Sequence, residues 1–320
     1  MNFNNITVDP RLVSEPADDL RHVLRPHPAA RESIPYMLVL PEERITAFVY
    51  TWVGPDSKGG AACCIYGPGV GPEPILEKLD GLDVPKNMDF TDWKVGNIHL
   101  RQTSPLKTAE VVYTGKRVTF EMHFEAFHPA YNYNGHPGGC PPAFADNRFE
   151  QSGLVKGVLT IDGRRIPYNT TGHRDHSWGA REWKAIQHWK WFQGHSGPDL
   201  SAHFLEILVA GRRYIRGYVY KDGKMAEVTD IDFQFEHDDT LEPLTMDTVL
   251  HDDAGRQLRI RGTKVATYPF LIAPTTLNTQ SGMSLEFDGT PGVGWLELSW
   301  PKDYIDYMST REEYPSATGK

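Results

Sequence analysis

The sequence lacks the hydrophobic runs and the basic excess that indicate a membrane or nucleic-acid protein. Its apolar runs, such as 205–210 and 270–273, fall far below the ~18 residues that a membrane span needs. Lys and Arg total 33 against 42 Asp and Glu, and no basic block stands out, so nucleic acid is not an expected partner. Residues 1–10 have neither the basic n-region nor the apolar h-region of a signal peptide. We therefore expect a cytoplasmic protein.

Signatures of common catalytic and metal sites are also missing. The three cysteines are Cys63 and its neighbour Cys64, with Cys140 alone, which predicts neither a disulfide framework nor a zinc ribbon. The 13 histidines show no metal-ligand spacing with a third ligand close by. The Gly-x-Ser-x-Gly motif of serine hydrolases does not occur. Prolines interrupt the glycines of 67–72, so this segment does not match a nucleotide-binding glycine-rich loop. We expect neither a metal nor a cofactor.

Turn-forming residues are abundant, with 29 Gly and 24 Pro, which favours short elements over long helices. Most of the chain alternates with period two between turns, as consecutive antiparallel strands do. The clearest hairpin turns at Asp162-Gly163, a pair that tolerates positive φ. Only 73–82 and 302–308 carry short helical signals.

A long meander of strands closes most economically into barrels, because closure leaves no exposed edge. The sequence therefore predicts an all-β protein with two antiparallel β-barrels packed together. We divide it into an N-terminal extension at 1–30, a first barrel at 31–175 and a second barrel at 176–320. A loop at 127–148, rich in Pro, Gly and aromatics, is of the kind that covers a site or a barrel end.

The densest group of chemically active side chains lies in 172–193, which holds four of the 8 tryptophans. In an extended segment His173 and Asp175 share one face, and His176 takes a different one. A carboxylate beside an imidazole raises its pKa and can make it a general acid near neutral pH. We therefore predict catalytic roles for His176, Asp175 and His173, with His176 giving or taking the proton.

An alternative interpretation gives this segment a purely structural role. Arg174, Asp175 and Arg181 can tie a domain junction together through buried ion pairs. Under the catalytic interpretation, Arg174 and Arg181 instead fix the loop around the catalytic group. Both interpretations make the two arginines structural residues.

Aromatic and polar residues in the expected strands are candidates for lining a pocket. Residues two apart share a strand face, so Trp189 pairs with Trp191, and Tyr218 pairs with Tyr220. Such rows are usually core, but in a hollow barrel they form a pocket that stabilises a carbocation. Polar groups that face a barrel interior need a partner or a ligand. The predicted substrate-binding residues are Trp178, Trp189, Trp191, His203, Glu206, Tyr218 and Glu297.

Several segments together carry a family resemblance. They are FEQSG at 149–153, the turn at 162–163, GHRDHSWG at 172–179 followed by Arg181, and the G-x-G-x-x-E pattern at 292–297. They resemble a bacterial branch of the AttH-like and hydroxyneurosporene synthase superfamily over about residues 30–305. The resemblance implies two lipocalin-like (calycin-type) barrels and a cavity for a large apolar molecule.

That superfamily includes carotenoid 1,2-hydratases, and fungal Diels–Alderase-type cyclases resemble it more distantly. The His-x-Trp pair of the hydratases matches His176 and Trp178, which implies proton transfer by His176 and a cation-stabilising wall at Trp178. Their downstream Tyr-x-Asp pair has no clear counterpart here. His203 and Glu206 lie near the position where that pair would fall, but they do not match it. The resemblance therefore does not support water addition to an alkene.

We therefore predict a cofactor-independent enzyme that acts by proton transfer on an apolar isoprenoid, steroid or polyketide-like substrate. The reaction classes are hydratase or dehydratase, isomerase, and cyclase. The alternative is a non-catalytic carrier of a small apolar metabolite, because small-ligand β-barrels commonly bind without reacting. The expected partner is a small apolar molecule, and a homo-oligomer is compatible with the sequence.

Overall fold

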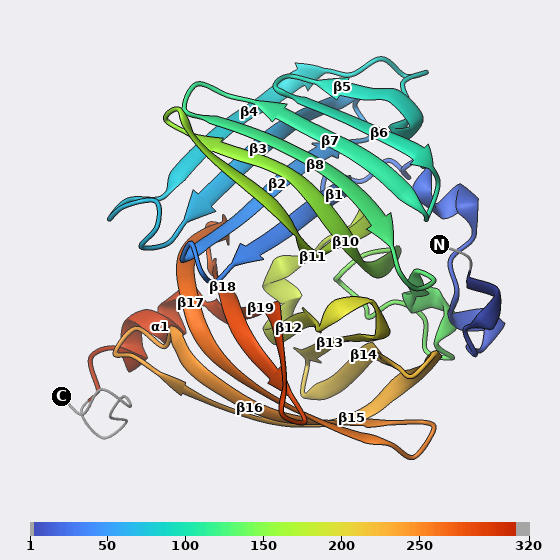
Figure 1. Cartoon of the computed structure of the whole chain (residues 1–320), viewed down its shortest axis with the longest axis vertical. Coiled ribbons are helices and arrows are strands. Elements are labelled where there is room, and N and C mark those ends of the chain that lie inside the picture. Colours follow the sequence, from blue (N-terminus) through green and yellow to red (C-terminus); the bar gives the residue numbers. More distant parts are fainter. Residues whose placement is uncertain (1–2, 312–320) are drawn as a thin grey trace.

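The computed structural model describes residues 3–311, and strands dominate its regular structure (Figure 1). The N-terminal sheet, blue to green, lies above a C-terminal barrel, yellow to red. The first sheet is nearly closed and the second is closed. The prediction of an all-β protein built from two barrel-like sheets is confirmed.

The N-terminal sheet has 11 strands, with the order β4-β3-β2-β1-β11-β10-β8-β7-β6-β5 and β9 beside β10. The strands are β1 (Ala30–Leu40), β2 (Ile45–Val53), β3 (Lys58–Tyr66), β4 (Ile75–Asp83), β5 (Trp93–Val95), β6 (Ile98–Ser104), β7 (Thr108–Thr114), β8 (Val118–Ala126), β9 (Tyr131–Asn132), β10 (Asn147–Ile161) and β11 (Arg164–Ala180). Across the remaining opening, Trp93 Nε1 of β5 donates a 2.8 Å hydrogen bond to Thr51 Oγ1 of β2.

The C-terminal barrel closes because its first strand pairs with its last. Its strands are β12 (Ile186–His195), β13 (Leu200–Val209), β14 (Arg212–Lys221), β15 (Lys224–His237), β16 (Pro243–Asp252), β17 (Gln257–Ala273), β18 (Thr276–Phe287) and β19 (Thr290–Pro301). The helices are α1 (Lys302–Met308) and the 3-10 turns η1 (Phe3–Asn5), η2 (Pro10–Leu12), η3 (Pro16–Asp19), η4 (Phe90–Asp92), η5 (Tyr133–Gly135), η6 (Trp183–Ala185) and η7 (Gly197–Asp199).

The expected Asp-Gly hairpin is present. Asp162 and Gly163 join β10 to β11 with φ of 48° and 86°, the left-handed conformation that a two-residue turn requires. The helix expected at 302–308 is confirmed as α1. The helix expected at 73–82 is wrong, because this segment forms the edge strand β4. A register shift against β3 breaks the two-residue alternation there, so its apolar spacing resembles that of a helix.

The first domain is longer than expected. The boundary placed between 175 and 176 falls inside β11, which pairs with β10 along its length and continues to Ala180. The barrel begins at Ile186, after η6. The N-terminal segment before β1 touches both sheets, since Thr7 bridges Lys224 and Val13 bridges Tyr131.

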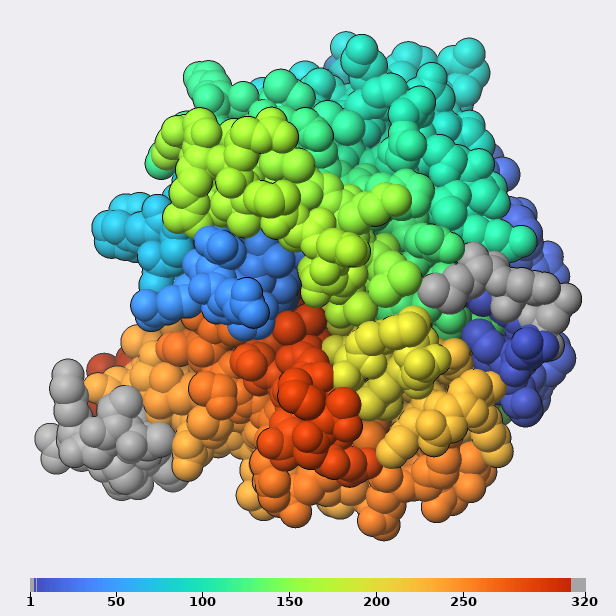
Figure 2. Space-filling model, in the orientation of Figure 1, coloured from blue at the N-terminus to red at the C-terminus, as the bar shows by residue number. Residues whose placement is uncertain are grey.

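Each sheet encloses an apolar core, and a third cluster fills the junction between the sheets. Figure 2 shows the two halves in close contact along this junction. Trp189 and Trp191 belong to the junction cluster, so the face that β12 turns toward the N-terminal sheet is aromatic. Among the described residues, no helix is long and apolar enough to cross a membrane.

Candidate active site

A cavity of about 410 Å³ lies in the junction between the two sheets. Strands β1, β2, β3, β4, β10 and β11 contribute to one wall, and β12, β17, β18 and β19 form the other. Its volume falls in the range of small-molecule sites. Five tryptophans line it, namely Trp52, Trp183, Trp189, Trp191 and Trp295. The predicted pair Trp189 and Trp191 therefore lies on a cavity wall.

Asp175 lines this cavity from β11 and is 3% exposed. Arg148 Nη2 lies 2.8 Å from its Oδ2. Burial raises the pKa of Asp175 to about 8; Arg148 opposes the rise, while Glu150 and Glu297 add to it. Burial therefore favours the protonated form of Asp175, and the side chain faces the space that a ligand would fill.

Glu150 keeps its charge beside Asp175 because it accepts several hydrogen bonds. Arg148 Nε, Tyr133 Oη and Trp191 Nε1 donate to its Oε1, and His173 Nε2 lies 2.9 Å from its Oε2. Burial opposes ionisation, but Arg148 and the neighbouring histidines hold the pKa of Glu150 far below its usual range. One buried charge is thus fixed behind Trp191, and it favours the protonated form of Asp175.

Glu297 is a second carboxyl on the cavity wall, contributed by β19. Asn278 Nδ2 donates a 3.3 Å hydrogen bond to its Oε2. Burial raises the pKa of Glu297; hydrogen bonds from Gln280 and Asn278 oppose the rise. The cavity therefore holds two carboxyl groups whose pKa values are both raised.

The predicted residues His173, His203 and Tyr218 do not line the cavity; they form a buried polar layer in the junction. His173 Nδ1 lies 2.9 Å from Ser152 Oγ, and burial lowers its pKa. His203 Nε2 lies 2.8 Å from Tyr133 Oη, and burial lowers the pKa of His203 to about 3. Both imidazoles are therefore neutral, and the layer supports Glu150 and Trp191 from behind.

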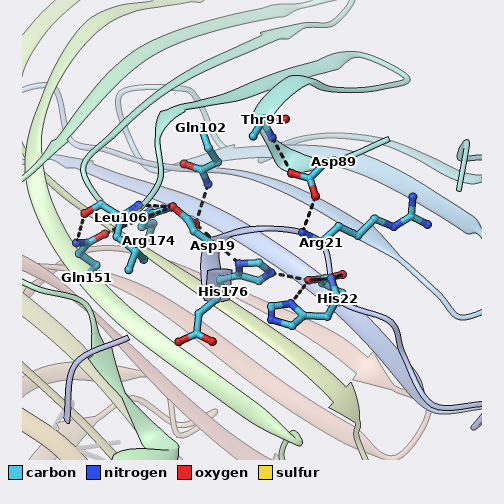
Figure 3. Close-up of polar contacts among 12 residues, drawn as sticks. Asp19, Arg21, His22, Asp89, Thr91, Gln102, Leu106, Gln151, Arg174 and His176 are labelled. Carbon is cyan, nitrogen blue, oxygen red and sulfur yellow. Dashed lines mark hydrogen bonds and ion pairs between the residues drawn. The ribbon is translucent and has the colours of Figure 1, made fainter. Parts of the chain in front are cut away.

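His176 lies on the opposite face of β11, fully buried in the N-terminal sheet (Figure 3). Its Nε2 is 2.8 Å from Glu32 Oε1, and its Nδ1 is 3.9 Å from Asp19 Oδ1. Burial opposes the charge, but the nearby carboxylates of Asp19 and Glu32 raise the pKa of His176. His176 is not among the residues that line the cavity.

The same inner face holds Arg174 and Trp178. Arg174 donates to both carboxylate oxygens of Asp19, at 2.8 and 2.9 Å, and to Gln151 (Figure 3). Trp178 stacks on His22 with ring centroids 3.7 Å apart. These contacts attach the N-terminal segment to β11, and Trp178 is not among the residues that line the cavity.

The remaining predicted residues lie apart from one another. Glu206 accepts from Lys190 and Arg213 in an ion-pair cluster and is not part of the cavity lining. Arg181 lines the cavity and donates to Ser33 Oγ and Ser177 Oγ at 2.8 and 2.7 Å.

His22, Glu32 and His176 could together hold a metal ion, since their ligand atoms lie within 4.8 Å of one another. Two imidazoles and a carboxylate suit zinc. In this structure the Nδ1 of His22 and the Nε2 of His176 lie 2.7 and 2.8 Å from Glu32 Oε1, which are hydrogen-bond distances. The three side chains are thus joined by hydrogen bonds through Glu32, while His176 Nδ1 is buried without a hydrogen-bond partner among the described residues. Sequence spacing missed it because Glu32 is far from His176 in the chain.

Sequence reasoning also missed Glu150, Arg148 and three cavity tryptophans. Glu150 and Arg148 are charged residues in a strand that also carries apolar residues. Charged residues in a buried strand need partners, and this pattern could have marked them as site candidates. Trp183 lies within the dense 172–193 segment, whereas Trp52 and Trp295 come from strands distant in sequence. Only the pairing of the two sheets brings them together.

Known proteins resemble this chain in part of its sequence and in its fold. It is 25% identical over 132 residues to the quinolone epoxide rearrangement protein penF of Penicillium thymicola. That match covers 39% of this chain and 36% of the relative, so the chain spans about a third of the relative's length.

Solved structures resemble it over most of its length. A putative AttH from Nitrosomonas europaea, 12% identical, has a TM-score of 0.61 over 91% of this chain and 96% of its own. CghA, 13% identical, has a TM-score of 0.61 over 86% of this chain and 89% of its own. The structure of CghA with Sch210972, 12% identical, has a TM-score of 0.62 over 86% of this chain and 89% of its own. The predicted lipocalin-like fold of the AttH type is therefore confirmed. The family described as domain of unknown function (DUF7064) matches residues 15–302, and the chain belongs to that family.

Proposed function

We propose that the protein is a cofactor-independent isomerase or cyclase that rearranges an apolar isoprenoid, steroid or polyketide-like molecule in the junction cavity, with Asp175 as the general acid. The observation that carries this proposal is a buried carboxyl, Asp175, whose raised pKa favours the protonated form and which lines an aromatic-walled cavity. Support also comes from the relatives, since penF is named for an epoxide rearrangement. The proposal gives to Asp175 the proton-transfer role that the sequence analysis expected for His176.

The proposed reaction starts with a proton from Asp175 to a ring oxygen, such as that of an epoxide, or to an alkene carbon of the substrate, so that the oxygen stays attached when one of its C–O bonds opens. A C–O bond then opens, or the alkene π electrons form the new C–H bond, and a carbon becomes positive. The indole faces of Trp189, Trp191 and Trp295 stabilise that charge by roughly 0.5–2 kcal/mol each. Arg148 stabilises the carboxylate left on Asp175.

The second half of the reaction restores the enzyme. After the carbon skeleton has rearranged or closed a ring, a carbon next to the cation loses a proton to the Asp175 carboxylate. Substrate and product then have the same composition, and no oxidant, reductant or cofactor is consumed. The buried indoles of Trp189, Trp191 and Trp295 limit the access of water on the inner walls, where water would otherwise capture the cation.

The test compares wild-type protein with Asp175→Asn in an extract of apolar metabolites, followed by liquid chromatography and mass spectrometry. The proposal predicts a product of unchanged mass and altered retention that only the wild type forms. A product that has gained the mass of one water would identify a hydratase instead. Recovery of one unchanged lipid from both proteins, without conversion, would support the carrier. Glu206→Gln, a carboxyl outside the cavity lining, is the matched control.

A further inference from the structure

Two arginines on the cavity wall lack a carboxylate partner. Arg181 donates to oxygen atoms of Ser33 and Ser177 and is also hydrogen-bonded to Tyr50. The Arg31 guanidinium lies over the rings of Tyr50 and Trp52, at 5.1 and 4.6 Å from their centroids. Within residues 3–311, no carboxylate lies at ion-pair distance from either guanidinium, and Arg31 Nε is buried without a hydrogen-bond partner.

The other charges of the cavity wall are already balanced. Arg148 contacts the ionised Glu150, and Lys78 pairs with Asp80 at 2.8 Å. Burial raises the pKa of both Asp175 and Glu297, which favours the neutral form of each carboxyl. Arg31 and Arg181 are half-buried on this wall and have no carboxylate of the described residues at ion-pair distance, so an anion in the cavity would supply the missing counter-charge.

Neighbouring groups respond to this positive charge. Burial opposes ionisation of Tyr50, yet Arg31 and Arg181 lower the pKa of Tyr50. Burial lowers the pKa of Arg181, and the nearby Arg31 and Arg148 contribute to that shift. In addition, the indole N–H of Trp189 on the opposite wall is buried without an acceptor. The unpartnered atoms at this cavity are donors, so it suits a ligand that supplies acceptors.

We propose that the ligand of this cavity is an amphiphilic acid, with an apolar body and one anionic oxygen group, a carboxylate or an ionised enol, held between Arg31 and Arg181. The inference rests on the proposed function in taking the cavity as the substrate site. A guanidinium donates two parallel N–H groups, which match the two oxygens of such an anion. Arg181 is bonded to Ser177, two residues from Asp175, so the anion lies about 7 Å along β11 from the acid.

The experiment uses two dyes that share one ring framework. Anilinonaphthalene sulfonate carries an anion, and phenylnaphthylamine is its neutral counterpart. Fluorescence titration of the whole protein is expected to give a Kd for the sulfonate at least tenfold lower than for the amine. Dodecanoate should displace both dyes at lower concentration than dodecanol does.

Arginine variants test which residues cause the preference for the anionic dye. Arg31→Met and Arg181→Met are each expected to weaken sulfonate binding by about tenfold or more, as loss of a charge-assisted hydrogen bond does, and to leave amine binding within about twofold. Arg31→Lys keeps the charge and most of the preference, which guards against a variant that folds poorly. Arg212→Met, at an exposed arginine of β14, should change neither dye.

Each other outcome overturns the inference in a recognisable way. Equal affinity for the two dyes, or equal weakening of both in the arginine variants, would show that charge plays no part, while the apolar cavity of the proposed function would stand. If neither dye binds and dodecanoate has no effect on thermal unfolding, the cavity is not a ligand site, and both proposals fail.

Discussion

Asp175 and His176 are consecutive residues of β11, yet their side chains enter different compartments. Asp175 lines the cavity between the sheets, and His176 lies inside the N-terminal sheet between Asp19 and Glu32. A carboxylate that faces away cannot orient the imidazole. The two residues should therefore respond differently to substitution, one in turnover and the other in folding stability.

Asp175→Asn is expected to lower kcat by about 100-fold or more, because general acid catalysis contributes roughly 10²–10⁴-fold. The amide has nearly the shape of the protonated carboxyl that it replaces, so at about pH 4, where residue 175 is neutral in both proteins, the free energy of unfolding in urea should change little. Turnover of the compound identified in the extract is the measurement, with Glu206→Gln as control. Full turnover in Asp175→Asn would remove Asp175 from the mechanism.

Turnover should fall as pH rises through about 8, since Asp175 loses the proton that it must donate. Its pKa in the unfolded chain is about 3.9, so between these two values the folded protein binds the extra proton. Stability from Asp175 is therefore complete below about pH 4 and declines until about pH 8. Urea unfolding across this interval should show the decline in wild type and its loss in Asp175→Asn. Parallel profiles would contradict the assignment.

His176→Gln is expected to lower the free energy of unfolding by about 3 kcal/mol, because it breaks a buried charge network. The folded-state pKa of His176 is raised, so its contribution is complete below the ordinary value of 6.5 and is lost as pH rises through the folded value. The deficit of the variant should therefore shrink at high pH. His99→Gln, at an exposed ion pair with Asp92, is the control and should cost at most about 1 kcal/mol.

Phenylnaphthylamine separates this stability role from a role in the cavity. If His176→Gln leaves the Kd of the dye unchanged while its stability falls, His176 acts on the fold. Loss of dye binding without loss of stability would return His176 to the cavity, against the structure.

The sequence predicted the hairpins and the alternation along β11 because both depend on neighbouring residues. Asp162-Gly163 specifies a tight turn, and period two requires Asp175 and His176 to face opposite ways. Alternation does not say which face meets a cavity. That depends on how the two sheets pack, and the packing also decides that Trp189 and Trp295 share a wall.

The sequence could not predict the partners of His176, for a different reason. Asp19 and Glu32 lie in and just after a segment without periodic signal, which the sequence marks only as an extension. Their contacts close loops of more than a hundred residues, and no local pattern encodes such a pairing. Long-range buried polar contacts of this kind are found only once the chain is folded.

Asp19→Ala provides the sharpest test of how the N-terminal segment is held. Asp19 is fully buried and pairs with Arg174 through both carboxylate oxygens, so its removal leaves a buried guanidinium uncompensated. The expected cost is about 3–5 kcal/mol in the free energy of unfolding. Asp83→Ala, at an exposed pair with Lys58, should cost at most about 1 kcal/mol.

The double variant Asp19→Ala/Arg174→Met distinguishes an unpaired charge from simple loss of contacts. Replacing both partners removes the buried charge along with its counter-ion, so the double variant should be more stable than Asp19→Ala alone. Urea unfolding of the four proteins in the cycle measures the coupling between the two residues. A double variant that loses the sum of the two single costs would show that Asp19 and Arg174 stabilise the fold independently. The N-terminal segment would then be held by its apolar contacts and by Glu32 with His22.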